Sequence, residues 1–392
     1  MFSDLPVLLD AGLVLIGIFV LGFIAFKTIV PNIILYILFG VALSGVLDHN
    51  VILHFSSEVA IVLLFFLLGL EFNTERLGDI AKKIWTTGIV DIILSLGVTM
   101  IISYAFGMDW ITSFLIGGIT YATSSSITAK LLDDKGRMAN TETEFVLGIL
   151  IFEDLIAPIV VAILIALNAG SSFQGIDLMI LMGKIIIIAV VAIILGKTVF
   201  KKFEDFLQKL DDDDLRIALL VGIAVTYSGF AMFLGLSEVL GAFLAGVMLA
   251  EIKKVDLVGG MVNPLKNLLL PTFFVYFGTT INIGAGVPFP VLLIVLVVWS
   301  VLAKVLVGIV GGKMYGLTKR VSFRAGLSIC ARGEFSVVIA SIAAGAIKVF
   351  AGIYIILSAL IGMILFNYAP KITTLIYGKP VKKKKNLKVP TI

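Results

Sequence analysis

The 392 residues are 60% hydrophobic and only 14% charged. Soluble domains contain about 45–50% apolar and about 25% charged residues, so this composition excludes an ordinary soluble domain and indicates that lipid is part of the solvent. The single cysteine excludes a disulfide framework and a cysteine metal cluster, and the two histidines argue against a histidine metal site.

Apolar segments follow one another along almost the whole chain. A membrane-spanning helix needs about 20 mostly apolar residues. We expect thirteen such segments, in chain order at residues 6–26, 30–47, 56–71, 84–106, 110–131, 144–168, 177–200, 215–235, 237–252, 264–282, 288–311, 322–346 and 350–369. No basic region precedes the first segment and no A-x-A-like site follows it, so we expect that segment to be retained. The sequence predicts an all-α polytopic membrane protein with 13 transmembrane helices.

The basic residues predict the orientation of these helices. An odd number of spans places the two termini on opposite sides of the membrane. If the C-terminus is cytoplasmic, most of the 30 lysine and arginine residues fall in cytoplasmic loops, as the positive-inside rule requires. We therefore expect the N-terminus outside, and a basic cytoplasmic tail at 370–392 whose Lys382 to Lys385 contact anionic lipid. The net charge of +4 then reflects topology, and we expect no nucleic-acid partner.

Thirteen helices divide into two halves of six joined by one linker helix near residues 177–200. Two six-helix halves separated by one helix have opposite orientations in the membrane, which is the inverted-repeat plan of many secondary transporters. The sequence contains no soluble domain, so we expect a single membrane transporter unit.

Two adjacent acids, Glu153 and Asp154, lie near the middle of the sixth segment. A charge at this depth costs at least ~2.5–3.5 kcal/mol, and two neighbouring carboxylates cannot both ionise cheaply where the dielectric constant is low. Such a carboxyl group can exchange a proton for a metal cation, which is the elementary step of proton-coupled antiport. Pro158 lacks the N–H that would bond the Asp154 carbonyl, which is then free to face an ion. The alternative is an ion pair that only locks two helices together.

Hydroxyl side chains crowd the fifth segment at YATSSSIT, residues 121–128. They compete with the backbone for hydrogen bonds and weaken the helix, so they predict a locally unwound span. Its carbonyl and hydroxyl oxygens, those of Thr123 and Ser124 among them, would suit a hard cation such as Na⁺ at the bilayer midplane. The alternative is that serine and threonine only allow helices to pack closely.

Three further charges lie within apolar segments. Lys304 in the eleventh segment is expected to pair with Glu153 or Asp154, unless its side chain extends to the cytoplasmic face. Arg332 and Glu334 flank Gly333 in the twelfth segment, the inverted-repeat counterpart of the fifth. We expect them to neutralise each other or the backbone of a helix break, as supports of crossed half-helices and not as ion ligands.

Weaker signals are four further charges and the two histidines. Asp91 and Lys184 lie at membrane depth without an evident partner, and Glu71 and Glu238 lie near helix ends. His49 and His54 fall in an outer loop, where histidines are usually passive.

The chain resembles the cation:proton antiporter-2 family, in particular the bacterial NapA-type Na⁺/H⁺ antiporters. The likeness spans almost the whole membrane region, and several motifs occur in the right order: LLFFLLGLEF at 63–72, YATSSSITAKLL at 121–132, LGILIFEDLIAPIV at 147–160, LGAFLAGVMLAE at 240–251, LLLPTFFVYFGTTI at 268–281 and ARGEF at 331–335.

The resemblance implies an NhaA-like fold with crossed, discontinuous fifth and twelfth helices, usually in a homodimer. The dimer domain would comprise about 6–71 and 215–282, and the core domain about 84–168 and 288–369. Asp154 matches the ion-binding aspartate, Thr123 a threonine of the unwound helix, and Lys304 the lysine that pairs with the first acid. The implied activity is exchange of cytoplasmic Na⁺, or Li⁺ or K⁺, for external protons across a prokaryotic plasma membrane, by an elevator-type movement.

One departure from the family pattern concerns the first acid. NapA-type proteins have Asp-Asp, whereas this chain has Glu153-Asp154, and Kef-like potassium/proton relatives tend to have Gln-Asp. Glu153 keeps the acidic character and so favours the two-carboxylate arrangement. The alternative function is a Kef-like K⁺/H⁺ efflux system or a cation channel. An intramembrane aspartyl protease would need its two aspartates on separate helices and a Gly-x-Gly-Asp motif that is lacking here. We accordingly expect no enzyme, and no cofactor besides the transported Na⁺ and H⁺.

Overall fold

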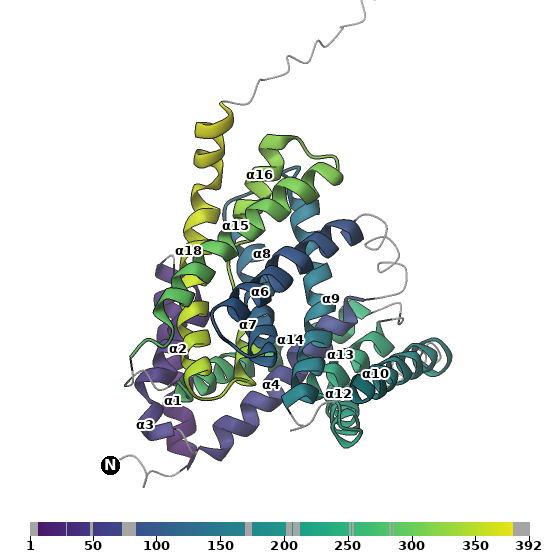
Figure 1. Ribbon diagram of the computed structural model, residues 1–392. Coiled ribbons are helices and arrows are strands. Elements are labelled where there is room, and N and C mark those ends of the chain that lie inside the picture. The colour runs from purple at the N-terminus through teal and green to yellow at the C-terminus, as the bar shows by residue number, and fades with distance from the viewer. Residues whose placement is uncertain are drawn as a thin grey trace, which may run out of the picture.

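The computed structural model describes residues 7–28, 30–47, 50–72, 84–168, 175–200, 206, 212–250, 252, 255–281, 284 and 286–378. His49 and the basic residues Lys382 to Lys385 lie outside these ranges. Within them every regular element is a helix, and the helices surround a central region formed by α7, α8 and α9 (Figure 1).

The helices run in chain order as follows: α1 (Val7–Lys27), α2 (Asn32–Ala42), α3 (Ser44–Leu47), α4 (Val51–Leu70), η1 (Ile92–Gly97), α6 (Val98–Ala105), α7 (Trp110–Tyr121), α8 (Ser125–Asp134), α9 (Thr143–Asn168), α10 (Gly175–Leu195), η2 (Gly196–Phe200), α12 (Asp213–Phe233), α13 (Glu238–Leu249), α14 (Val255–Thr279), α15 (Pro290–Met314), α16 (Lys319–Ser328), α17 (Glu334–Ser341) and α18 (Gly345–Tyr377). The largest shift of a single boundary is in α14, which begins at Val255 and not near residue 264. α18 extends beyond its predicted segment 350–369 at both ends, so the first residues of the expected tail at 370–392 are helical.

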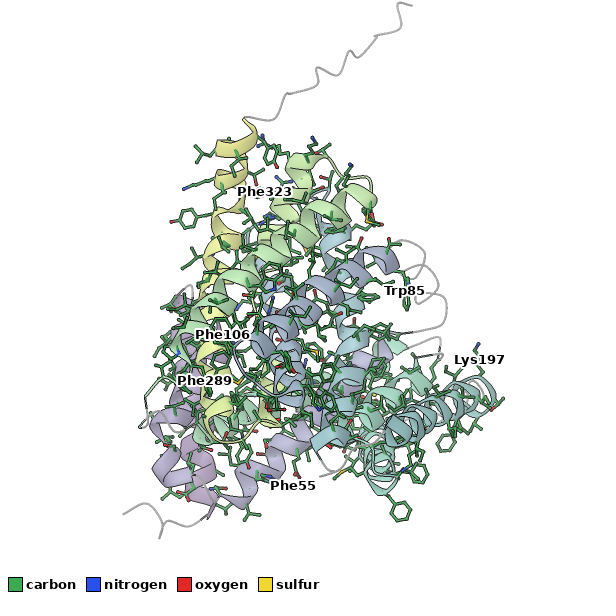
Figure 2. All side chains as sticks on the ribbon, in the orientation of Figure 1. Phe55, Trp85, Phe106, Lys197, Phe289 and Phe323 are labelled. Carbon is green, nitrogen blue, oxygen red and sulfur yellow. The ribbon has the colours of Figure 1, made fainter. Side chains whose placement is uncertain are left out.

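Seven helices of the described chain are long and apolar enough to cross a membrane. Large apolar side chains also project from the outside of the molecule, for example those of Phe55, Trp85, Phe106 and Phe289 (Figure 2). An apolar exterior of this extent is costly in water and is favourable in lipid. The all-α membrane architecture predicted from composition is therefore confirmed.

Glycines bring the backbones of certain helix pairs close together. Gly69 of α4 lies against Gly246 of α13, and a Cβ atom at either position would collide with the backbone of the other helix. Gly40 of α2 and Gly278 of α14 meet in the same way. Lipid does not drive helices together, so small residues that allow a close approach stabilise such pairs through dispersion attraction at short distance.

Two of the apolar segments are interrupted, as their polar residues predict. α7 ends at Tyr121 and α8 begins at Ser125, while α16 ends at Ser328 and α17 begins at Glu334. The two interruptions touch, because the Ser124 N–H donates to the Ala331 carbonyl at 2.8 Å. A Cβ atom on Gly333 would collide with the Ser124 side chain, so the close approach requires glycine there. Four helix ends therefore meet in the middle of the molecule.

Candidate functional site

The adjacent acids lie on α9, directly beside the interruption between α7 and α8. Glu153 is fully buried and Asp154 is 5% exposed. The Glu153 carboxylate accepts hydrogen bonds from the backbone N–H of Thr123 and, at 3.1 Å, from its hydroxyl group. Because Thr123 lies between two helix ends, its N–H has no intrahelical partner and is available to the carboxylate. The predicted acids and the predicted unwound span thus form one site.

Lys304 of α15 also reaches this site. Its Nζ atom lies 2.8 Å from Glu153 Oε1, so the predicted pairing with Glu153 is confirmed. The same Nζ atom lies 2.8 and 2.9 Å from the two carboxylate oxygens of Asp91. The side chains of Lys304, Asp91 and Glu153 are fully buried. The sequence showed no evident partner for Asp91, and the fold supplies one by bringing it beside a lysine 213 positions away.

Asp91 stands immediately before the π-helical turn η1. The Ser95 hydroxyl group in that turn donates to Asp91 at 2.7 Å. The Ser95 carbonyl in turn accepts a hydrogen bond from the Thr120 hydroxyl group at 3.1 Å. Single π-helical turns are frequent at functional sites. Here the turn links the buried ion pair to the last residues of α7. The signal in the sequence was the same one that selected Glu153, namely an acid inside an apolar segment.

Arg332 and Glu334 do not pair with each other. The Arg332 guanidinium donates to the Thr120 carbonyl at 2.8 Å and to the carbonyls of Ile329 and Cys330, each at 3.5 Å. It satisfies oxygens that the helix ends leave without intrahelical donors. Of the two predicted roles, neutralisation of the backbone is therefore confirmed for Arg332, and mutual neutralisation is wrong.

Glu334 lies in a cluster of hydroxyl groups. Its carboxylate accepts hydrogen bonds from the Ser124 hydroxyl at 2.7 Å, from the Ser126 N–H at 3.1 Å, from the Ser126 hydroxyl at 3.0 Å and from the Ser125 hydroxyl at 3.3 Å. The first turn of α8 supplies these donors, and a helix N-terminus favours negative charge. Among the described residues no cation lies within ion-pair distance of Glu334.

Asp154 shares one hydroxyl group with Glu334. The Ser125 hydroxyl lies 3.3 Å from Asp154 Oδ1 and 3.3 Å from Glu334 Oε1. Within the described ranges Asp154 forms no ion pair, although it is almost completely buried. The hydroxyl group of Tyr121, which is close enough to Asp154 to interact electrostatically, is also buried without a hydrogen-bond partner. A carboxylate in this position needs a proton or a cation to balance its charge.

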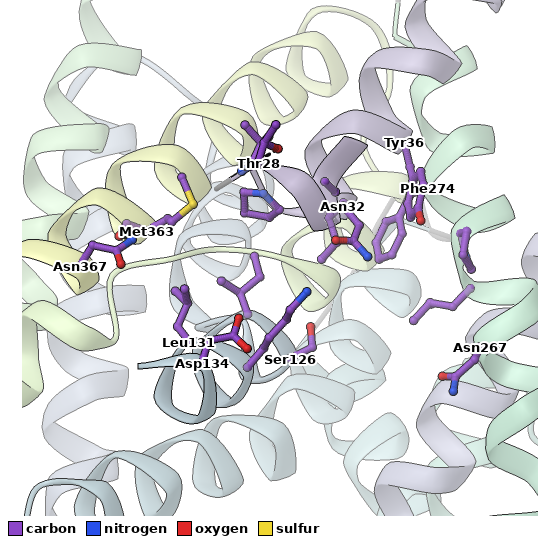
Figure 3. Close-up of a pocket in the computed structure, with 18 of the residues that line it drawn as sticks. Thr28, Asn32, Tyr36, Ser126, Leu131, Asp134, Asn267, Phe274, Met363 and Asn367 are labelled. Atoms are coloured by element: carbon purple, nitrogen blue, oxygen red, sulfur yellow. Dashed lines mark hydrogen bonds between the residues drawn. The ribbon is translucent and has the colours of Figure 1, made fainter. Parts of the chain in front are cut away.

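A cavity of about 470 Å³ reaches this group of oxygens at Ser126. Its wall follows α8 from Ser126 in the first turn to Lys135 beyond the last, and Asn32, Asn267 and Asn367 face it from α2, α14 and α18 (Figure 3). Ser126 is exposed, whereas Glu153 has no exposed surface. Water therefore reaches the Glu334 side of the site through Ser126, and the Lys304 side is sealed.

Two weaker signals have structural explanations. The Lys184 ammonium group, expected to have no evident partner, donates to the Leu234 carbonyl at 3.0 Å. Glu71, at the end of α4, lies near enough to Asp154 and Lys266 to interact electrostatically with both. Lys184 thus lies outside the site and Glu71 at its edge.

Comparison with known proteins shows the family to which the chain belongs. A family model described as "Sodium/hydrogen exchanger, transmembrane" matches residues 12–373. The chain belongs to this exchanger family. The family consists of membrane-spanning cation/proton antiporters, which are secondary transporters and not enzymes, and no cofactor is evident for it. The resemblance to cation:proton antiporters is therefore confirmed.

Similar proteins differ in the cation that their names give. The exchanger is 51% identical over 378 residues to the ammonium/H⁺ antiporter subunit AmhT of Alkalihalophilus pseudofirmus, covering 96% of this chain and 97% of that protein. It is 27% identical over 345 residues to the K⁺/H⁺ antiporter subunit KhtU of Bacillus subtilis, covering 84% and 82%. Its fold matches that of the sodium proton antiporter MjNhaP1 of Methanocaldococcus jannaschii with a TM-score of 0.69 at 17% identity, over 95% and 99% of the two chains.

Proposed function

We propose that this exchanger trades a monovalent cation for protons at Asp154. The observation that carries the proposal is a buried carboxylate that has no ion-pair partner in the described structure and lies beside a hydroxyl cluster reached from a cavity. A proton and a cation can each balance this charge, but they exclude one another. Competition for one carboxylate, combined with access to alternate sides, is sufficient for antiport.

The proposed position of the cation is between Asp154 and Glu334, at the Ser125 hydroxyl group that both carboxylates share. This assigns Glu334 to the ion site, in contrast to the support role expected from the sequence. Thr123 and Ser124, predicted as ligands, then orient the carboxylates of Glu153 and Glu334 and add oxygen atoms to the site. Lys304 balances the charge of Glu153 and leaves Asp154 available to the cation.

For the transported cation we propose ammonium in addition to the Na⁺ that the family resemblance implies. The relative with 51% identity is named for ammonium, and the more distant one for K⁺. Carboxylate and hydroxyl oxygens accept hydrogen bonds from ammonium and also coordinate alkali cations. A Kef-like K⁺/H⁺ exchange is the second candidate, and it is supported by the KhtU similarity.

The proposed transport cycle moves the core domain past a dimer domain in a thirteen-helix, NhaA-like homodimer, with the C-terminus in the cytoplasm of a prokaryote. The cavity supports this division, because Asn32 and Asn267 belong to segments assigned to the dimer domain and Ser126 and Asn367 to segments assigned to the core. A boundary that already contains a cavity is where one domain would slide along the other. The helix near residues 177–200 would connect the two halves.

Exchange in proteoliposomes tests the proposal. A pH-sensitive dye would report proton movement after additions of NH₄⁺, K⁺, Na⁺ and Li⁺, with protein-free liposomes correcting for leakage of ammonia. We expect saturable exchange with the wild-type protein and background rates with Asp154→Asn. Glu58→Gln, which changes an exposed carboxylate, is the matched control and should keep the wild-type rate.

Two results would overturn the proposal. Undiminished exchange by Asp154→Asn would remove this carboxylate from the mechanism. A conductive flux of any of these cations without proton movement would instead indicate a channel.

A further inference from the structure

We propose that Asp91 is a permanent second counter-ion of Lys304, so that the exchangeable protons are carried by Glu153 and Asp154 and not by Lys304. Asp91 is thus a positioning residue for the exchange reaction. The inference rests on proton-coupled exchange at Asp154, and it selects among three groups that could in principle carry a proton in that exchange.

The hydrogen bonds of Lys304 are distributed unequally between its two partners. An ammonium group has three N–H donors. Two of the three contacts reach the oxygens of Asp91, at 2.8 and 2.9 Å, and one reaches Glu153 at 2.8 Å. If the bond to Glu153 is broken, Lys304 therefore keeps a bidentate partner of opposite charge.

The location of Asp91 makes this partner a fixed one. The Ser95 hydroxyl group holds one Asp91 oxygen at 2.7 Å. The Trp299 indole N–H on α15 donates to the Leu94 carbonyl in η1 at 3.2 Å, which ties the helix of Lys304 to the turn that follows Asp91. Glu153, by contrast, is bonded to Thr123 between the ends of α7 and α8, beside the proposed cation position. Glu153 is therefore the partner whose contacts change when the site is loaded.

Charge balance decides which group takes the proton. The groups that face Lys304 are Asp91 before η1, Glu153 on α9, the Tyr121 ring on α7 at 5.5 Å, and the Cys330 thiol between α16 and α17. The tyrosine and the thiol are neutral at neutral pH. Protonation of Glu153 leaves a neutral Lys304–Asp91 pair. Loss of the Lys304 proton would leave two adjacent carboxylates without a cation in a sealed interior, which is far more costly.

The first test is the pH profile of exchange by Asp91→Asn. Asparagine has the shape of aspartate and still accepts a hydrogen bond from Ser95. Without the charge of Asp91, Glu153 interacts with the whole charge of Lys304, so we expect the pH of half-maximal exchange to move toward acid by about one unit or more. Asp91→Glu, which keeps the charge, should restore the profile toward that of the wild type. A residue with only a structural role would change the amount of folded protein and not this pH.

The second test removes Asp91 and Lys304 together, so that the net charge of the triad with Glu153 is unchanged. The double variant Asp91→Asn/Lys304→Gln keeps Glu153 and Asp154, and we expect it to retain at least a tenth of the wild-type exchange rate with an unchanged number of protons per cation. The double variant also tests the inference if the single variant Asp91→Asn does not fold. The number of protons would be obtained from the membrane potential at which net flux stops.

The outcomes are separable from a failure of the proposed function. If the wild-type protein shows no proton-coupled flux with any cation tested, the proposed function fails. If the wild type exchanges but Asp91→Asn has the wild-type pH profile, the inference about Asp91 is wrong. If the folded double variant loses exchange or carries fewer protons per cation, Lys304 carries a proton and the inference is wrong as well.

Discussion

Two groups of buried charges meet at the neighbouring residues Glu153 and Asp154, and they differ in what balances them. The triad of Lys304, Asp91 and Glu153 contains its own cation, has short contacts throughout and is sealed from water. The cluster of Asp154, Ser125 and Glu334 contains two carboxylates without an ion-pair partner among the described residues, and exposed Ser126 connects it with a cavity.

The difference indicates that the neighbouring acids Glu153 and Asp154 have different roles. A charge that is fully paired by the protein contributes to the fold and is not available to a ligand. A charge that the protein leaves unpaired can be balanced only by something that arrives from outside. Adjacent positions on one helix turn can thus have different roles, since successive side chains on α9 point in different directions.

The largest effect is expected from Lys304→Met, which should break the triad. Removing one partner of a buried ion pair costs roughly 3–5 kcal/mol, because the carboxylates of Asp91 and Glu153 then lose their cation. Thermal unfolding in detergent would measure the loss. Lys313→Met, at an exposed position of the same helix, is the control and should leave the unfolding temperature unchanged. A Lys304→Met protein as stable as the wild type would contradict the role of the triad in the fold.

Glu334→Gln changes the cluster of Asp154, Ser125 and Glu334. We expect it to weaken cation binding more than it lowers the stability of the fold. The glutamine still accepts hydrogen bonds from Ser124 and Ser126, but the cation loses one of two carboxylates. Hydrogen bonds to charged groups contribute about 1.5–3 kcal/mol, so we expect the apparent cation affinity to fall roughly 10- to 100-fold. The cation dependence of exchange in proteoliposomes would show it. An unchanged cation affinity would show that Glu334 is not an ion ligand and only supports the crossed half-helices, as expected from the sequence.

A third ion cluster lies in the loop between α8 and α9, outside the membrane spans, and can be compared with the two buried groups. Glu142 accepts hydrogen bonds from Arg137 and Arg324. Burial alone would raise the pKa of Glu142, but the hydrogen bond and charge of Arg324, together with Arg137, lower that pKa below its ordinary 4.5. Because the pKa of Glu142 is lower in the folded than in the unfolded protein, its ionised form stabilises the fold. This stabilisation is fully present at pH values above the ordinary pKa of glutamate, and it is lost as the pH falls through the pKa of the folded state.

Glu142→Gln should therefore destabilise the protein by about 2 kcal/mol at neutral pH, and by less in acid. Unfolding temperatures of variant and wild type at pH 7 and at successively lower pH would test this. The difference should narrow below pH 4.5, the ordinary value for glutamate. A difference that is constant with pH would show that the two arginines do not favour the ionised form of Glu142.

The smallest effect is expected from Ser95→Ala. This change removes one hydrogen bond to Asp91 but leaves its two contacts with Lys304, so the free energy of unfolding should fall by about 1 kcal/mol. Ser103→Ala, at a buried hydroxyl group without a hydrogen-bond partner, is the matched control. Chemical denaturation of both variants would separate the hydrogen bond from the burial of a hydroxyl group. Equal stability of the two variants would show that Ser95 does not hold Asp91.

Several features of the fold could be predicted because they depend on local composition. The membrane class and the positions of most helices follow from the free energy of placing each segment in lipid. The two interruptions follow from polar side chains and a glycine that weaken the helix locally. The start of α14 was missed because Asp256, Gly259, Gly260 and Asn263 lower the hydropathy and the helix propensity of its first turns, and Pro264 follows them. Proline inside a membrane helix is tolerated when neighbouring groups satisfy the backbone, and a single sequence does not show those neighbours.

The sequence by itself determined which acids and bases are costly in the membrane and which hydroxyl groups weaken a helix. Only the tertiary structure decided which of these groups meet. It placed Asp91 against Lys304, directed Arg332 to carbonyl oxygens and left Glu334 among serines. The physical reason is that transfer into lipid is a property of each segment, whereas pairing of charges depends on distances of a few ångströms between helices far apart in the chain.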